Sequence, residues 1–253
     1  MTLTRHLVAF TAVGVPRFAI AKTLVTTAKG ASHVIESSVS SRPLTMIALM
    51  GALSLLPFAV MMLTSFTKIS VVLSIARSVL GSQQLPPTTV LMGLAVVLTA
   101  HVMTPVAQDI YRAVLNLDFD QESPEQVFSA AGRAGEPLRA FLVKHGRAED
   151  REMFVELGRE LRGPERAAEV TDRQLSVIVP AFVISELKEA FQIGFLIFLP
   201  FLVLDMVIAN ILLALGMQTL SPTQVSLPFK LLLFVMVDGW GLLAKGLVLG
   251  YRG

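Results

Sequence analysis

Three charged side chains stand inside the most apolar part of this sequence, where they could relay protons or hold helices together. The last third of the chain carries Asp205, Lys230 and Asp238 among long runs of Leu, Ile, Val and Phe. A charge that faces lipid at mid-membrane costs about 2.5–3.5 kcal/mol, whereas each large apolar residue returns only about 0.3–0.6 kcal/mol. We therefore expect these charges to lie in protein contacts rather than against lipid.

The spacing of these residues around a polar turn indicates how they are arranged. The turn QTLSPTQVS contains Pro222, and with Ser226 expected as the following N-cap it predicts a helical hairpin. Residues equidistant from the turn share a depth, which places Asp205 and Asp238 within about one helical turn of each other. Lys230 follows Ser226 by only four residues, so we expect its side chain to reach the polar boundary and anchor a helix end.

Two interpretations of the aspartates remain open. In the structural interpretation, Asp205 and Asp238 make buried contacts between helices or between subunits. In the functional one, they form the proton relay of a secondary transporter or proton channel. Replacing each aspartate by asparagine separates these interpretations, because a proton carrier would lose transport while its assembly survives.

A second group of charges, Glu186, Lys188 and Glu189, comes just before the apolar run that begins at Ala190. This position predicts a boundary between polar and apolar surroundings. We expect the three side chains to be solvated or paired between subunits.

The sequence carries none of the common catalytic or metal-binding patterns. It has no cysteine and four scattered histidines, and it contains no H-E-x-x-H, no G-x-S-x-G and no glycine-rich phosphate loop. No cluster of Lys and Arg with interleaved aromatics indicates nucleic acid binding. We expect a protein that is not an enzyme and that needs no cofactor or metal.

The elements that must position these charges are hydrophobic helices. The 253 residues are 53% apolar and 16% charged, with a mean hydropathy of +0.67, which is typical of a membrane protein. Leu44 to Phe66 is a run of 23 residues without a charge, long enough to cross a hydrocarbon core of about 30 Å. A second charge-free run extends from Thr88 to Gln108. We predict an all-α, membrane-associated fold of helical hairpins that forms oligomers.

Changes in composition divide the chain into four regions. Residues 1–43 are basic and rich in Ser and Thr, and we expect a disordered or signal-like extension. Residues 44–116 and 178–253 are the hydrophobic helical regions. Residues 117–177 form a hydrophilic helical region, in which positions 117–174 hold thirteen acidic and nine basic residues. We expect this region to bury narrow apolar stripes made of Phe141, Leu142, Met153, Phe154, Leu157 and Leu161.

Four blocks follow one another along the sequence: SLLPFAVMMLTSFTKISVVLSIARSVLGSQQLPP, VMTPV, PAFVISELKEAFQIGFLIFLPFLVLDMVIANILLALGM and SLPFKLLLFVMVDGW. Together, and in this order, they resemble the signature blocks of the FliP/SctR family, the export-gate proteins of type III secretion systems. The resemblance extends from about Leu44 to the C-terminus and is weakest across the hydrophilic region. The segments ANILLALGM and GLVLGYRG are more similar to the injectisome branch than to the flagellar branch.

The resemblance implies a core subunit of the export gate, a multi-pass protein of the bacterial inner membrane with residues 117–177 in the periplasm. Such a subunit assembles with sister copies, expected as a pentamer, and with two smaller export-gate membrane proteins. Further expected partners are other export-apparatus proteins, membrane lipid and the secreted substrates. The implied function is a gated pore through which unfolded proteins cross the inner membrane.

The hairpin turn is where the resemblance places the pore gate. In many relatives, consecutive methionines there form a flexible gasket, a use suited to long thioether side chains. The corresponding residues in this chain are Met217, Gln218, Thr219 and Leu220, so only one methionine remains. We expect a ring of Met217 and Leu220 from several copies to close the pore; the alternative is that Met217 packs a helix end.

Overall fold

A computed structural model of the protein describes residues 43–81, 86–115, 124–217 and 219–252. The secondary structure of these residues is helical, with no strand among them, which confirms the predicted all-α class. Positions 1–42 of the predicted extension, and Gln218 of the predicted gate, lie outside the described residues. The chain divides into two compact units, residues 1–57 and 58–253, and each is described by itself.

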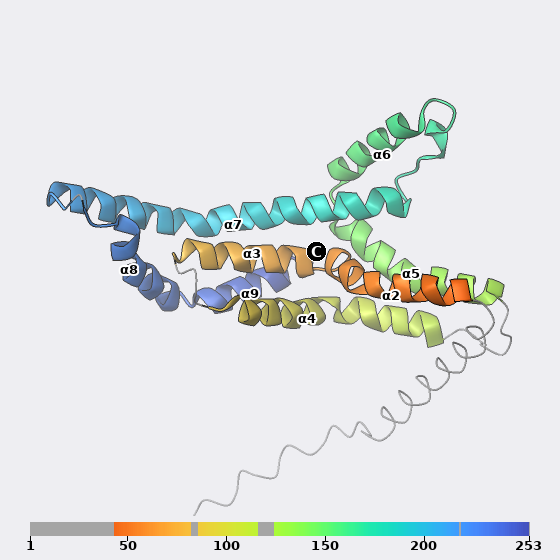
Figure 1. The fold of residues 1–253 in the computed structure, drawn as a ribbon, viewed down its shortest axis with the longest axis horizontal. Helices are drawn as coiled ribbons and strands as arrows, with labels where there is room; N and C mark the ends of the chain where they lie inside the picture. The colour runs from red at the N-terminus through yellow and green to blue at the C-terminus, as the bar shows by residue number, and fades with distance from the viewer. Residues whose placement is uncertain (1–42, 82–85, 116–123, 218, 253) are drawn as a thin grey trace, which may run out of the picture. The chain divides into compact units, whose positions relative to one another are not determined.

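The first predicted membrane run is divided between two helices. Helix α2 spans Pro43–Met62 and carries no charge, and α3 spans Phe66–Val79 (Figure 1). In the break, the Thr64 hydroxyl donates to the Val60 carbonyl at 2.7 Å and the Thr67 hydroxyl donates to the Met61 carbonyl at 2.9 Å. These hydroxyls satisfy carbonyls that the end of α2 leaves without a helical partner, so the break is stabilised locally.

The core of the second unit is built on α3. Its buried residues recur at helical spacing and contact α4 (Thr88–Leu115) and α7 (Leu175–Ala214), and α4 in turn contacts α9 (Gly239–Leu249). Figure 1 shows α3 running alongside α7. The central apolar cluster is made of Ile69, Val72, Leu73, Leu91, Ala95, Ala190 and Leu247. Helix α3 therefore joins the early and late hydrophobic regions of the sequence.

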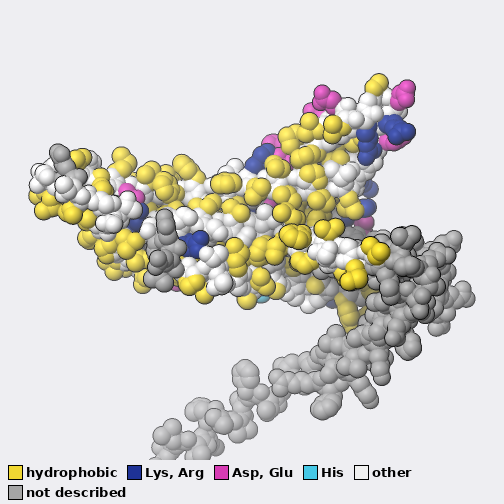
Figure 2. Space-filling model, in the orientation of Figure 1, with side chains coloured by type: hydrophobic (Ala, Val, Ile, Leu, Met, Phe, Trp, Pro, Cys, Tyr) yellow, Lys and Arg dark blue, Asp and Glu magenta, His cyan; other side chains and the backbone are white. Residues whose placement is uncertain are grey.

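The hydrophilic region forms α5 (Pro124–His145), α6 (Ala148–Arg162) and the short 3-10 helix η1 (Ala167–Glu169). Phe141 and Leu142 are buried in a cluster with residues of α7, as predicted. Met153, Leu157 and Leu161 are instead 38%, 42% and 87% exposed, so the prediction that this region buries them is wrong for the chain alone. Charged side chains gather around α6 in Figure 2, whereas apolar side chains dominate the surface along α7 and α8.

Helix α7 has 40 residues and continues without a break past Glu189. At 1.5 Å per residue it is about 60 Å long, roughly twice the thickness of a hydrocarbon core. Part of α7 must therefore extend beyond any bilayer that the rest of it crosses.

Several described helices are long and apolar enough to span a membrane. They are α4 and α7, and up to four spans result if each of two bent helix pairs counts as one. One bent pair consists of α8 (Pro222–Met236) and α9, which meet at 58°. Helix α8 packs back against α7, which confirms the predicted helical hairpin.

Candidate functional site

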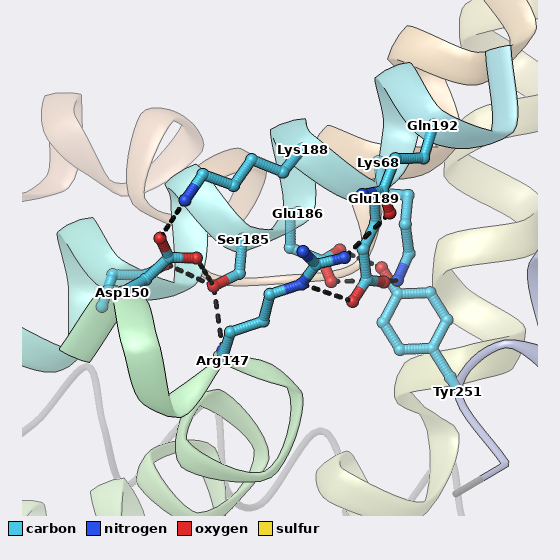
Figure 3. A network of polar contacts seen from close by, with 10 residues as sticks. Lys68, Arg147, Asp150, Ser185, Glu186, Lys188, Glu189, Gln192 and Tyr251 are labelled. Atoms are coloured by element: carbon cyan, nitrogen blue, oxygen red, sulfur yellow. Dashed lines mark hydrogen bonds and ion pairs between the residues drawn. The ribbon is translucent and has the colours of Figure 1, made fainter. Parts of the chain in front are cut away.

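A buried lysine on α3 is clamped by two glutamates of α7. The Lys68 ammonium lies 3.0 Å from a carboxylate oxygen of Glu186 and 2.8 Å from one of Glu189 (Figure 3). Lys68 is 2% exposed and Glu186 is fully buried. The Tyr251 hydroxyl donates to Glu186, and the Lys68 nitrogen lies 3.9 Å from the centre of the Tyr251 ring. This cluster joins α3, α7 and the residues after α9 within one chain.

A second ion pair lies beside the first and holds α6 against α7. Asp150 is 1% exposed, pairs with Lys188 and lies 2.7 Å from the Ser185 hydroxyl. The Arg147 backbone N–H donates to Ser185 at 2.9 Å, and the Arg147 guanidinium lies 3.6 Å from Glu189. Burial on its own would raise the pKa of Asp150, but the hydrogen bonds from Lys188 and Ser185 outweigh it and lower that pKa.

The expectation for Glu186, Lys188 and Glu189 is thus corrected in one respect. All three side chains pair within their own chain, with Lys68 or Asp150, rather than lying free in solvent. Glu186 and Glu189 share a helix face because they are three residues apart, which allows both to reach one ammonium group. Whether any of the three also contacts another subunit stays a prediction.

Aromatic rings cover one side of this network. The His145 ring lies 4.7 Å from the Phe141 ring and 5.0 Å from the Tyr251 ring, measured between centroids. Burial, followed by the positive charges of Lys68 and Lys144, lowers the pKa of His145 to about 4. Burial and the neighbouring Glu186 carboxylate raise the pKa of Tyr251. At neutral pH the imidazole is uncharged and the phenol keeps its proton.

The hairpin charges are arranged differently from the prediction. Lys230 is 3% exposed and pairs with Asp205 at 2.6 Å, so it does not reach out to a polar boundary. Ser226 donates to Asp205 at 2.5 Å and is fully buried within α8, while Ser221 occupies the N-cap position. The helix begins earlier than expected because Pro222 occupies its first turn, where proline is tolerated.

Asp238 is not drawn into this pair. It is exposed and sits between α8 and α9 in the left-handed conformation, with φ 51°. The prediction of equal depth assumed one continuous helix after the turn, whereas the chain bends at Asp238 and Asp205 meets Ser226 and Lys230 instead. The two aspartates therefore have different surroundings.

The predicted gate residues lie at the tip of the α7–α8 hairpin. After α7 ends, Gly216 has φ 71°, the Gly216 N–H donates to the Leu213 carbonyl at 3.1 Å, and the Met217 N–H donates to the Leu212 carbonyl at 3.0 Å. This pair of bonds is a Schellman motif, which ends a helix sharply and commonly requires glycine. Met217 is 47% exposed, Leu220 is 49% exposed and Thr219 is also exposed. The described residues of the predicted gate therefore follow the end of α7 and are exposed.

The side chains in these clusters form ion pairs and hydrogen bonds with one another. Within the described ranges, no group of three or more His, Cys, Asp or Glu side chains is placed to hold a metal ion. Each buried carboxylate faces an ammonium or hydroxyl group, which fixes helices relative to one another.

Sequence reasoning missed the partners of the α7 glutamates. Lys68 follows the charge-free run Leu44 to Phe66 by two residues, and the cost of burying a charge there required an acidic partner. That partner lies 118 residues away, and the i, i+3 spacing of Glu186 and Glu189 was the available signal. Asp150, Ser185 and Tyr251 gave no comparable signal, since nothing in their local sequence sets them apart.

Comparisons with known proteins agree with the resemblance in the sequence. The model of the FliP family matches residues 49–247. A hypersensitivity response secretion protein, HrcR, of Ralstonia nicotianae is 44% identical over 209 residues, covering 82% of this chain and 96% of the relative. The Yop proteins translocation protein R of Yersinia pestis is 46% identical over 211 residues, covering 82% and 96%. The flagellar biosynthetic protein FliP of Cereibacter sphaeroides is 50% identical over 210 residues, covering 83% and 68%.

Proposed function

The chain belongs to the FliP family, and from this premise we propose that it is a core subunit of a type III secretion export gate in the bacterial inner membrane. Relatives named for secretion, translocation and flagellar biosynthesis support a role in protein export. Sister copies and two smaller membrane proteins complete the gate, and the subunit performs no chemistry of its own. The segments ANILLALGM and GLVLGYRG favour the injectisome branch.

The main observation in support of this proposal is the hairpin tip. The Schellman motif at Gly216 ends a 40-residue helix and leaves Met217 and Leu220 exposed beyond it. About half of each of these side chains is exposed, which leaves apolar surface for a contact outside the chain. Brought together from several copies, they form an apolar constriction that excludes ions by dewetting. An unfolded substrate separates the tips, driven by energy supplied elsewhere in the apparatus.

The outer surface of α7 supports an assembled, membrane-bound state. Phe195, Leu196, Val203 and Met206 are each about 60% exposed in the single chain. An exposed apolar surface of this extent suits lipid and neighbouring subunits rather than water. The polar region around α5 and α6 then lies beyond the hydrocarbon core, in the periplasm.

The conductance of the resting membrane tests the proposal. Cells carrying Met217→Ala together with Leu220→Ala are expected to leak ions, because the constriction loses its bulky apolar side chains. Val203→Ala is the matched control, since it shortens another exposed apolar side chain, on α7 away from the tip. If the double variant leaks no more than this control, the gate assignment is wrong.

The transporter alternative gains no observation in its favour. A relay between Asp205 and Asp238 requires proton exchange between them, but Asp205 is held by Lys230 and Ser226 while Asp238 lies at the α8–α9 bend. Asp205→Asn and Asp238→Asn still separate the two functions: impaired assembly favours the gate, and lost transport with intact assembly favours the relay.

A further inference from the structure

Helix α9 has one face in the protein core and the other face uncovered. Leu247 is 2% exposed, and Trp240 and Leu243 pack against the central cluster. The opposite side of the helix is exposed along its whole length. This exposed α9 face consists of Asp238, Gly241, Leu242, Lys245, Gly246 and Leu249.

Two opposite charges stand on the exposed α9 face, and neither has a partner among the described residues. Asp238 and Lys245 are absent from the ion pairs that the chain makes within itself. Asp238 precedes α9 in the left-handed conformation, and its carboxylate lies over Gly241. Gly241 and Lys245 are four residues apart on α9, so both charges stand on the same side of the helix. In an apolar helix pair that could cross a membrane, both charges need a partner from outside.

The surface between the two charges suits a closely packed helix. Gly246 has no side chain, and open space surrounds the position that one would take there, whereas the Asp238 carboxylate covers the corresponding position at Gly241. Leu242 is 59% exposed and Leu249 is 45% exposed, so apolar knobs stand beside the glycines. Small residues next to such knobs are typical of helix interfaces in membranes, where close backbone approach supplies the packing energy.

We propose that the exposed α9 face binds a second copy of this chain, with Asp238 of one copy paired to Lys245 of the other. The face is complementary to itself because it carries one anion and one cation. Copies that share one membrane orientation pack this face in parallel, and a displacement along the helix brings Asp238 of one copy to Lys245 of the next, with one such pair at each interface. The inference rests on the proposed assembly of sister copies, and it names the surface and the residues that join them.

Cysteine cross-linking tests this contact directly, because the sequence has no cysteine of its own. Full-length Asp238→Cys and Lys245→Cys chains with different tags are expressed together, purified in detergent and treated with a short bismaleimide. We expect an adduct that carries both tags. The matched control combines Asp238→Cys with Phe229→Cys, another exposed position, on α8, and is expected to give little adduct.

A second variant tests the same contact without changing Asp238, in case a cysteine there disturbs the bend between α8 and α9. Lys245→Glu places two carboxylates opposite each other, and we expect association of purified chains to weaken by about tenfold or more. Lys245→Arg keeps the cation and should restore association. The inference is overturned if the 238–245 adduct matches the control, or if Lys245→Glu associates as well as the unaltered chain because lipid or a smaller partner satisfies the charges.

The outcome is separable from that of the proposed function. Absence of the 238–245 adduct in chains that still form oligomers and a closed gate removes this contact alone. Resting conductance unaffected by the tip substitutions removes the gate and leaves the α9 contact in place.

Discussion

The charges around the first half of α7 are buried and paired within the chain, whereas the charges on α9 are exposed and unpaired among the described residues. Lys68, Glu186 and Asp150 are almost completely buried, and each has a partner of opposite charge in its own chain. Asp238 and Lys245 are exposed, and no described residue of the chain pairs with them. Glu186 and Lys245 both lie in strongly apolar helices, yet one is paired within the chain and the other is not, so hydrophobicity of the segment does not explain the difference.

The difference indicates which stage of assembly each set of charges serves. A buried pair with good geometry fixes helix positions before any partner arrives, because separating it leaves an uncompensated charge. Exposed charges on an apolar helix face remain costly until a partner supplies the opposite charge. We call the paired charges around α7 the α7 network; it consists of Lys68, Glu186, Glu189, Asp150 and Lys188. This network therefore stabilises the fold of one subunit, and the exposed α9 face serves the association of subunits.

Removing the buried cation is expected to have the largest effect. Lys68→Met leaves Glu186 buried with only the Tyr251 hydroxyl as a partner, which should lower the free energy of unfolding by about 3–5 kcal/mol. Thermal unfolding of the purified chain in detergent measures this loss. Lys68→Met combined with Glu186→Leu should recover part of it, because the uncompensated charge is then gone.

An exposed ion pair provides the control for Lys68. Arg112 lies 3.2 Å from Asp109, and these side chains are 72% and 57% exposed. Because solvent screens such pairs, Arg112→Met should change the free energy of unfolding by no more than about 0.5 kcal/mol. Equal losses for Lys68→Met and Arg112→Met would show that the α7 network does not stabilise the subunit.

The sequence was sufficient for the fold class and for the presence of the hairpin. Runs such as Thr88 to Gln108 are long, apolar and free of charge, and this pattern depends only on local composition. The gate positions Met217 and Leu220 followed from the family resemblance, and the structure places both at the hairpin tip. Their role in closing a pore stays a prediction.

The pairing of charges could not be predicted in the same way. Lys230 was assigned to a polar boundary from its distance to Ser226, but burial between α7 and α8 brings it to Asp205 instead. The depth of a residue in a hairpin depends on where the helices begin and bend. The bend at Asp238 changes the depth of this residue, and no proline at that position announces the bend in the sequence. Contacts between segments over a hundred residues apart, such as Lys68 with Glu186, depend on packing that a single sequence does not record.

A smaller effect is expected from His145, whose protonation opposes the α7 network. The pKa of His145 is about 4 in the folded chain against 6.5 in the unfolded chain, so only the unfolded chain binds the proton between these values. The free energy of unfolding is therefore not reduced by His145 above pH 6.5, and it decreases as the pH falls towards 4. Between pH 6.5 and 5 we expect a loss of at most about 1 kcal/mol, because the ring is partly exposed.

His145→Gln isolates this contribution, because its side chain has no charge at any pH in the range. Thermal unfolding between pH 6.5 and 5 should depend less on pH in this variant than in the unaltered chain. His101→Gln, at an exposed histidine of α4, is the matched control and should keep the full dependence. An unchanged dependence in His145→Gln would mean that burial and Lys68 do not keep the imidazole neutral.

The smallest effect on folding is expected from Asp238→Asn, and this sharpens the contrast between the two regions. Asparagine shares the tolerance of aspartate for the left-handed conformation, so Asp238→Asn removes the charge and keeps the bend. Below the concentration at which copies associate, we expect the unfolding temperature to change by less than about 2 °C. Asp238→Ala should lower it by about 3–6 °C, because alanine is strained at a positive φ.

A large loss in Asp238→Asn would place Asp238 with the α7 network, as a charge that folding itself requires. If instead stability is kept and only association is weakened, the carboxylate acts between subunits, and the bend at Asp238 serves to present it.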